Sequence, residues 1–238
     1  MLTLKDIRFS YGGPPVLDGV SLSVQSGESV ALVGANGAGK TTLARICAGV
    51  FLPDSGVLAS NGVSAADSPV RYRKSVGYVP EADRRPCGFT VKAFLKFRAG
   101  LKGERAGRIR RRVLDTAVLC GIEDLLDEPA ATLSRGNARR VALAEAVLAR
   151  PRNLVLDDPF AGMDAQARAA AAATLAALRP HAAVLFATHD FEAVAAMATH
   201  VAVLAGGAIA DFFRLSPGMG AKELSERAYA RDAAGGAP

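Results

Sequence analysis

A glycine-rich segment near the N-terminus constrains this chain of 238 residues more than any other feature. The segment GANGAGKT, at residues 34–41, matches the phosphate-binding pattern G-x-x-x-x-G-K-[ST] in full. It follows a short apolar run at residues 29–33 and precedes a stretch of helical character at residues 41–49. A strand, a glycine-rich turn and a helix in this order predict a binding site for a nucleoside triphosphate.

Each residue type in this segment has a chemical reason to be there. Glycines let the backbone turn its N–H groups inward around phosphate oxygens, and the helix that follows adds N–H donors and the positive end of its dipole. Lys40 supplies a positive charge for the β- and γ-phosphates, and the hydroxyl of Thr41 can ligate Mg²⁺. The nucleotide contacts predicted here are Gly34, Asn36, Gly37, Ala38, Gly39, Lys40, Thr41 and Thr42.

An acidic segment later in the sequence adds the carboxylates that a site for a nucleotide and Mg²⁺ needs. Residues 154–159, LVLDDP, are an apolar strand that ends in two carboxylates. We expect Asp157 to hold Mg²⁺ directly or through water, and Asp158 to polarise the attacking water. Downstream of a complete phosphate-binding segment, this pattern indicates nucleotide hydrolysis.

Residues 133–137, LSRGN, predict a second helix start that can bind an anion. Ser134 stands at the N-cap position before a run of helix formers. One nucleotide needs only one phosphate-binding segment, so a second such opening indicates another partner.

The pattern along the chain alternates strands and helices, which predicts an α/β fold. Expected strands lie at residues 2–9, 20–24, 29–33, 51–60, 76–79, 154–156, 183–188, 201–204 and 208–212, and a helix is expected at 165–177. The predicted domain is a single unit, residues 1–238. Residues 1–81 and 151–230 form its core with an antiparallel β subdomain, residues 82–150 an inserted helical subdomain, and residues 231–238 a flexible tail.

Composition excludes several classes of protein. Half of the chain is apolar, which excludes a disordered chain, and three widely spaced cysteines build no disulfide framework and favour a reducing compartment. Residues 193–210 lack Asp, Glu, Lys and Arg, but His200 and the pair Gly206-Gly207 favour a helix end, a strand and a turn over a membrane span. We expect a cytoplasmic protein.

The order of these motifs resembles the ATPase subunit of an ATP-binding cassette (ABC) transporter, along nearly the whole chain. Tyr11 resembles the aromatic residue that stacks on adenine, and residues 133–137 resemble the signature Leu-Ser-Gly-Gly-Gln. Residues 161–164 correspond to the D-loop, the triplet Thr188-His189-Asp190 to the switch histidine, and residues 78–81 to the Q-loop.

The resemblance implies a P-loop NTPase of the ABC type, with a mixed core sheet, ATP and Mg²⁺ as cofactors, and a head-to-tail dimer that closes on ATP. It implies a permease on a separate chain, a peripheral position on the cytoplasmic face of the membrane, and no nucleic-acid partner. The implied catalytic residues are Asp158, His189 and Glu81, and the implied metal-binding residues are Thr41, Asp157 and Glu81. Ser134, Gly136 and Asn137 are implied to contact the ATP of the opposing subunit.

Four departures from the family pattern modify these expectations. Glu81 replaces the usual Gln, Arg135 replaces the first signature Gly, and Asn137 shortens the final Gln. The pair Pro80-Glu81, with residues 89–97 after it, resembles the type-2 exporter branch associated with gliding motility, drug and copper export. Asp158 stands where the family has Glu, so we expect slow hydrolysis with ATP binding intact, unless the backbone shifts to compensate.

Two features of the inserted helical region each allow two roles. The arginines at residues 105–112 suit either a solvated helix face or contact with anionic lipid headgroups, and Phe94 and Phe97 suit either a core or a docking site. For the whole chain, the alternative function is a non-transport ABC ATPase that acts on nucleic acid or the ribosome. Such proteins usually have two cassettes in one chain or long coiled-coil insertions, for which 238 residues leave no room. A nucleotide kinase would not need residues 133–137.

Overall fold

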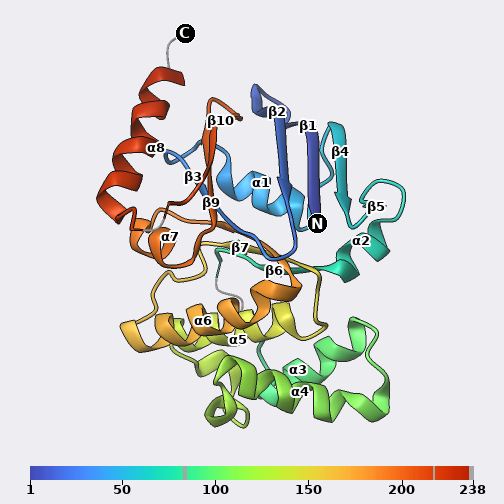
Figure 1. Ribbon diagram of the computed structural model, residues 1–238. Coiled ribbons are helices and arrows are strands. Elements are labelled where there is room, and N and C mark those ends of the chain that lie inside the picture. Colours follow the sequence, from blue (N-terminus) through green and yellow to red (C-terminus); the bar gives the residue numbers. More distant parts are fainter. Residues whose placement is uncertain (83–84, 217, 236–238) are drawn as a thin grey trace.

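The computed structural model describes residues 1–82, 85–216 and 218–235 (Figure 1). Its centre is a six-stranded sheet, called the core sheet below, with the strand order β10-β9-β3-β8-β7-β6. These strands are β3 (Ser29–Val33), β6 (Val76–Val79), β7 (Asn153–Asp157), β8 (Ala183–Ala187), β9 (His200–Ala205) and β10 (Ala208–Arg214). All neighbours pair in parallel except β9 and β10, which form an antiparallel hairpin. The predicted mixed sheet is therefore confirmed.

The core sheet is covered on both faces, as continuous apolar strands require. Every residue of β3, β7 and β8 is buried. Alternate residues point to opposite faces, so Ala31 and Val33 join one apolar core while Val30 and Leu32 join the other.

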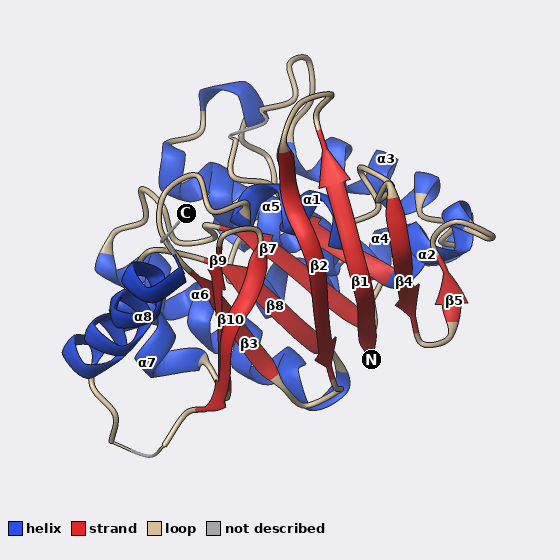
Figure 2. Cartoon of the chain, turned by 90° about the horizontal axis from the view of Figure 1, so that it is seen from above, coloured by secondary structure: helices blue, strands red, loops and turns tan. Residues whose placement is uncertain are grey.

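One face is covered by α1 (Lys40–Cys47) and by an antiparallel sheet from the N-terminal part of the chain. That sheet has the order β2-β1-β4-β5, from β1 (Leu2–Ser10), β2 (Pro15–Val24), β4 (Ser55–Ser60) and β5 (Val63–Ser64). Figure 2 shows its strands crossing over those of the core sheet. Strand β4 begins later than the predicted residue 51, because Pro53 has no N–H for pairing and the carboxylate of Asp54 instead accepts the Ser10 N–H.

The opposite face is covered by helices that lie below the core sheet in Figure 1. They are α3 (Val91–Leu101), α4 (Ala106–Cys120), α5 (Arg135–Val147) and α6 (Ala165–Leu178), with short 3-10 turns at Glu123–Leu125 and Ala130–Thr132. The first three lie between β6 and β7, within the predicted helical insertion. Local signals set their ends: Thr90 caps α3 and Asp164 caps α6 through side-chain oxygens, and Gly121 ends α4 with a positive φ of 61°.

Three further helices are α2 (Pro69–Ser75), α7 (Phe191–Met197) and α8 (Ala221–Gly235). Of these, the sequence indicated only the end of α7, whereas α2 and α8 have no counterpart among the expected elements. Helix α8 includes residues 231–235, which were expected to belong to a flexible tail, and residues 236–238 lie outside the described part of the chain. In the parts of the chain that are described, no helix has the length and apolarity needed to cross a bilayer. Residues 193–210 form the end of α7, strand β9 and the turn into β10, as predicted.

Candidate functional site

Strands β3, β7 and β8 end at the same edge of the core sheet, beside the first turn of α1. A cavity of about 260 Å³ opens there. Because parallel strands bring their carboxyl ends together, residues distant in sequence meet at this edge. The predicted site residues that line the cavity are Asn36, Gly37, Gly39, Lys40, Thr41, Thr42, Glu81, Asp157, Asp158 and His189.

The glycine-rich loop depends on glycine at two positions where the backbone is crowded. A Cβ on Gly34 would lie 2.2 Å from the carbonyl oxygen of Leu204, so only glycine lets the loop leave β3 in this direction. Gly39 has a φ of 101° and a side chain there would press on Leu17 at 3.0 Å. Gly34 and Ala38 shape the loop without lining the cavity.

The ammonium group of Lys40 folds back over this loop. It donates to the carbonyl oxygens of Gly34 at 2.7 Å and Ala35 at 2.8 Å. The positive charge is thereby held at the N-terminus of α1, where phosphate oxygens would bind.

Thr41 and Asp157 form a polar pair at the base of the cavity. The Thr41 hydroxyl donates to Oδ1 of Asp157 at 3.2 Å, while the other carboxylate oxygen of Asp157 is buried and has no hydrogen-bond partner among the described residues. Burial raises the pKa of Asp157 to about 6, the Thr41 hydrogen bond opposes this shift, and the nearby charge of Glu81 adds to it. A buried carboxylate oxygen without a partner fits a bound cation.

The donor set at this position suits Mg²⁺ bound together with a phosphate ligand. Among the described residues no group of three His, Cys, Asp or Glu side chains gathers to hold a metal by itself. Mg²⁺ commonly uses one or two carboxylates plus oxygens of the substrate phosphates and water. Asp157, the hydroxyl of Thr41 and, from across the cavity, Glu81 provide such a partial set.

Asp158 is tied to the end of β8. Its backbone N–H donates to the carbonyl of Ala187 at 2.9 Å, and its Oδ1 accepts from the hydroxyl of Thr188 at 3.3 Å. Nδ1 of His189 lies 3.5 Å from Oδ2, with most of the imidazole exposed to the cavity. Asp158 also has a positive φ of 46°, an uncommon conformation for a residue with a side chain. The carboxylate expected to activate water is thus held between two residues of the switch-histidine segment.

Tyr11 lies near this site without lining the cavity. Its hydroxyl is 3.1 Å from the Thr42 hydroxyl, and its ring meets those of Phe9 and Phe51 nearly at right angles. The side chain is 56% exposed, so ring surface is available for a base to stack on.

The LSRGN segment opens α5 at a separate place in the molecule. Oγ of Ser134 accepts the Asn137 N–H at 3.2 Å, which confirms the predicted cap, and Ser134 is exposed. The Arg135 side chain passes over Gly162, so the segment lies against residues 161–164. Ser134, Gly136 and Asn137 do not line the phosphate cavity of their own chain.

A buried arginine, Arg139, was not predicted from the sequence; it is 1% exposed within α5. Its guanidinium donates to the backbone carbonyls of Pro80 and Glu81. The signal that could have found it is position: Arg139 shares one helix face with Leu143 and Ala146, where an apolar residue is expected. This arginine links the LSRGN helix to the segment that carries Glu81.

The family model for ABC transporters matches residues 17–161. The chain is 40% identical over 214 residues to an ABC transporter ATP-binding protein of Halobacterium salinarum, covering 88% of this chain and 91% of that one. It is 38% identical to the cobalt import ATP-binding protein of Rhodobacter capsulatus, covering 96% and 82% of the two chains. It is 37% identical to the Nod factor export ATP-binding protein I of Ralstonia nicotianae, covering 71% and 52%.

A solved structure described as the ATP-binding subunit of an ABC transporter superposes with a TM-score of 0.87. That structure shares 27% identity with this chain, and the match covers 96% of this chain and 99% of the other.

Proposed function

Because the chain belongs to the ABC transporter family, we propose that it binds and hydrolyses ATP to energise transport through a membrane permease on a separate chain. One observation carries this proposal. The phosphate-binding loop, the acidic end of β7 and the His189 segment converge on one cavity, while a second anion-binding helix start is exposed elsewhere. A solitary nucleotide-binding protein has no use for the second opening.

The residues of the cavity, together with Tyr11 beside it, have separate roles in hydrolysis. Lys40 and the N–H groups of the loop bind the β- and γ-phosphates, and Tyr11 stacks on the base. Thr41 and Asp157 would hold Mg²⁺, which supplies positive charge against the phosphate oxygens. Asp158 orients a water molecule and accepts its proton as the water oxygen attacks the γ-phosphorus. The bond to the β–γ bridging oxygen breaks, which yields ADP and phosphate.

His189 and Glu81 bracket this reaction. His189 lies beside Asp158 with its imidazole exposed to the cavity, so it can donate a hydrogen bond to the γ-phosphate. Glu81 adds negative charge near the metal, which favours cation binding over the binding of phosphate alone. Hydrolysis slowed by the short side chain of Asp158 is part of this proposal.

We propose that the working unit is a head-to-tail dimer. The exposed start of α5 has a capped N-terminus with N–H donors and a positive dipole end, features that favour a phosphate ligand. The cavity of the same chain does not reach it, so the ATP of a second subunit is its proposed ligand. Ser134, Gly136 and Asn137 are the proposed contacts.

A groove of about 1170 Å³ is the proposed contact site for the permease. It lies between α1 and α2 on one wall and α3 and α5 on the other. Apolar side chains such as Phe51 and Phe94 line it together with several cations, and Glu145 is bonded to two of them, Arg98 and Lys102. Pro80 and Arg139 also line the groove, so a segment docked there touches the chain that leads to Glu81.

The direction of transport that we propose is export. Its support is the pair Pro80-Glu81 and the segment at residues 89–97, which resemble the type-2 exporter branch. Relatives whose names specify import match the chain as well as those that specify export. The direction is measured with the co-purified membrane protein in proteoliposomes, by supplying ATP on one side only.

The decisive experiment is an ATPase assay of the full chain, alone and with the membrane protein that co-purifies with it. We expect Mg²⁺-dependent release of phosphate from ATP, abolished by Lys40→Ala, and a change in rate when the membrane protein is present. If neither the chain nor its complex with the membrane protein retains radiolabelled ATP, the proposal is contradicted. Stimulation by RNA or DNA instead of a membrane protein would favour the non-transport alternative.

A further inference from the structure

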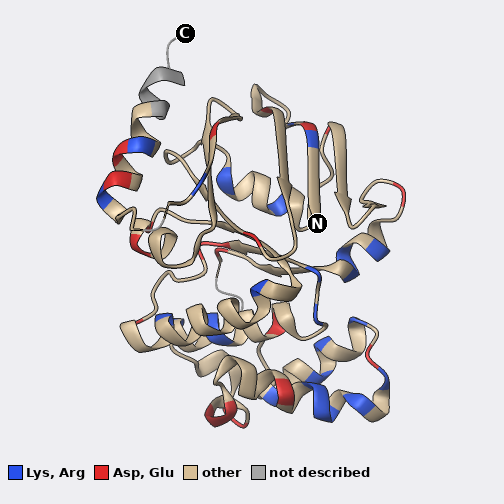
Figure 3. Ribbon diagram, viewed as in Figure 1, with Lys and Arg blue, Asp and Glu red and all other residues tan. Residues whose placement is uncertain are grey.

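The positive charge of this protein is concentrated in one part of the chain. Residues 69–112 contain 14 Lys and Arg against 3 Asp and Glu, a net charge of +11. The whole chain has a net charge of +6, so the other residues together carry −5. In Figure 3, Lys and Arg gather on α2 and on the hairpin of α3 and α4, toward the right of the view.

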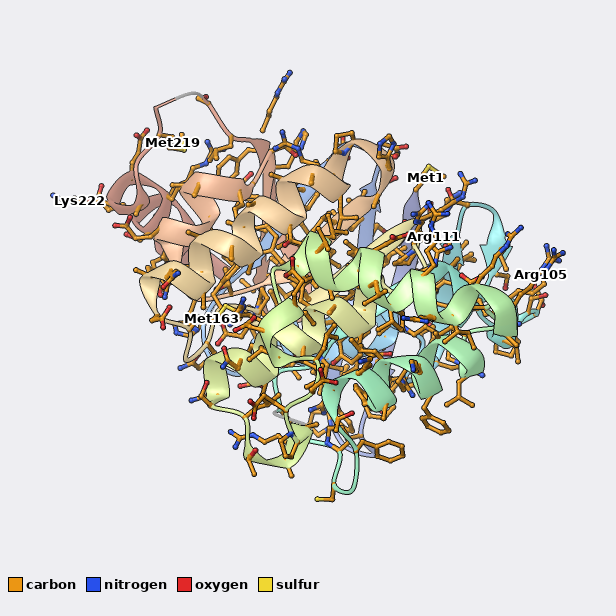
Figure 4. All side chains as sticks on the ribbon, turned by 90° about the horizontal axis from the view of Figure 1, so that it is seen from below. Met1, Arg105, Arg111, Met163, Met219 and Lys222 are labelled. Atoms are coloured by element: carbon orange, nitrogen blue, oxygen red, sulfur yellow. The ribbon has the colours of Figure 1, made fainter. Side chains whose placement is uncertain are left out.

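Helix α2 and the α3–α4 hairpin lie side by side across the mouth of the permease groove. The ammonium nitrogen of Lys74, in the last turn of α2, is 3.7 Å from where a Cβ on Gly103 would be. Gly103 lies in the turn between α3 and α4, and Arg105 follows it at the outer edge of the molecule (Figure 4). The two groups of cations therefore form one continuous surface. This surface, called the basic face below, consists of Arg71, Arg73, Lys74, Arg105 and Arg108.

The cations of the basic face have few counter-charges. All five residues are exposed, and within the described part of the chain no ion pair joins Arg71, Arg105 or Arg108 to an acid. Glu104, the one acidic residue between positions 85 and 112, is bonded to Arg112 at 2.8 Å. A surface with this excess of positive charge attracts a polyanion.

Large apolar side chains stand among these cations. Val70 of α2 is 59% exposed and Leu101 at the end of α3 is 60% exposed. Phe97, one turn before Leu101, is 52% exposed, and its ring stacks on Phe89 rather than presenting a clear platform for bases. Cations with exposed aliphatic side chains between them suit the headgroup region of a bilayer. There, the charges attract anionic headgroups and the apolar side chains are removed from water, and both effects favour binding.

We propose that the basic face rests on anionic phospholipid headgroups. The proposal depends on the proposed function in one respect: the groove receives a permease segment, so the face around its mouth is turned toward the membrane. The lipid contact adds an affinity of the ATPase subunit for the bilayer itself. It also fixes the orientation of the subunit before its groove is filled.

The test is sedimentation of the full chain, without permease, with vesicles of phosphatidylcholine alone or with about a third phosphatidylglycerol. We expect binding only to the anionic vesicles, decreasing as salt increases. The triple variant Arg71→Gln, Arg105→Gln, Arg108→Gln is expected to lower the partition coefficient by roughly 100-fold, given the usual contribution of a basic residue near an anionic surface.

A matched control removes the same charge elsewhere. Arg179, Arg214 and Lys222 are exposed, and Lys222 lies at the side of the molecule opposite Arg105 (Figure 4). The triple change of these residues to Gln is expected to leave vesicle binding within about twofold, since only charges near the bilayer contribute. An equal loss in both triple variants would overturn the proposal, because net charge alone would then explain it.

Two further results would also overturn the proposal. One is equal binding to neutral and anionic vesicles, and the other is preferential binding of an RNA or DNA oligonucleotide over anionic vesicles. ATP hydrolysis without vesicles is measured on the same samples and is expected to be unchanged in both triple variants. If the parent chain binds anionic vesicles but hydrolyses no ATP, that result counts against the proposed function alone.

Discussion

Asp158 combines an uncommon backbone conformation with two side-chain contacts. A positive φ at a residue with a Cβ costs roughly 1 kcal/mol or more. Such strained positions cluster at functional sites, where the backbone fixes the direction of a side chain. Here the carboxylate is aimed toward Thr188 and His189, and it is one methylene shorter than the Glu of related ATPases. We infer that the reach of this side chain limits the rate of hydrolysis.

Lengthening this side chain tests the inference directly. Asp158→Glu is expected to raise ATP turnover by up to about 100-fold, since displacements near 1 Å change rates by that order. The rate is measured as phosphate release at saturating ATP. Asp158→Asn, which keeps the size and removes the charge, is the control and should be inactive. A turnover of Asp158→Glu at or below that of the parent chain would mean that the backbone already compensates.

Asp157 makes the stability of the nucleotide-free protein depend on pH. Its folded-state pKa, about 6, exceeds the ordinary value of 3.8, so the folded protein binds this proton more tightly than the unfolded chain. The stabilisation is complete below a pH of about 4 and is lost as the pH rises through about 6.

The variant Asp157→Asn lacks this titration. Between a pH of about 4 and 7, the parent chain is expected to lose about 2 kcal/mol of unfolding free energy relative to the variant, from a pKa difference near two. Urea denaturation at both pH values, without Mg²⁺, measures the difference. Parallel behaviour of the two proteins would show that the carboxylate is already ionised without a cation.

At the residue scale, the sequence indicated candidate site residues that lie next to recognisable patterns and that the structure brings to one cavity. Lys40 and Thr41 begin the helix that follows β3 and its loop, and Asp157 is the last residue of β7. Because the ends of parallel strands meet, their convergence could be predicted. The hydrogen bond from Thr188 to Asp158 could not be predicted. It depends on the adjacency of β7 and β8 and on the positive φ of Asp158, and a pair of aspartates in the sequence indicates neither.

At the element scale, Arg139 couples α5 to the segment after β6. Its guanidinium satisfies two carbonyl groups in a place shielded from water, and charged hydrogen bonds of this kind contribute about 1.5–3 kcal/mol. Helix α5 is therefore bonded directly to the segment that carries Glu81.

Arg139→Met is expected to lower the unfolding free energy by about 3 kcal/mol, because two carbonyls lose their donors. The measurement is urea denaturation with Arg110→Met, an exposed position on α4, as the control, which should change stability by less than about 0.5 kcal/mol. Equal stabilities of the two variants would show that the guanidinium contributes nothing net.

Elements with strong local signals were predicted well. The strands around the phosphate loop and the hairpin at Gly206-Gly207 lie where apolar runs and turn residues indicated them. Helices α2 and α8 were not predicted, and only the end of α7 was. Helix α2 has one buried residue, Tyr72, and four of its seven residues are polar or charged, so its apolar residues are too few to produce a helical period. Helix α7 is apolar at every position except Glu192, so it shows no alternation between an apolar and a polar face.

At the scale of the whole molecule, the exposed start of α5 predicts an ATP-dependent doubling of mass. In the hydrolysis-deficient variant Asp158→Asn, Mg·ATP is expected to convert monomer into dimer, measured by analytical ultracentrifugation. Adding Ser134→Glu should prevent this, because a carboxylate would meet the γ-phosphate of the partner. Adding Ser134→Thr keeps the capping hydroxyl and should preserve the dimer. A dimer that persists with Ser134→Glu would place the contact on another surface.

The order of strands in the two sheets is a property of the whole molecule that no local pattern specified. Alternating and continuous apolar runs predicted which strands are half-buried and which are buried on both faces. The placement of β3 between β8 and β9 follows from the crossover connections and from the packing of α1 under the antiparallel sheet. Both depend on contacts between distant segments, so no local pattern in the sequence determines them.

The hydrogen bonds from Lys40 to its own loop have a consequence for the exchange of nucleotide. The ammonium already has two oxygen acceptors on its own loop, so an incoming phosphate either shares the lysine with these carbonyls or takes their place. When product departs, the same two carbonyls recapture the lysine. After ADP leaves, the lysine is therefore expected to keep hydrogen-bond acceptors in the empty loop, which lowers the cost of holding its charge there between one nucleotide and the next.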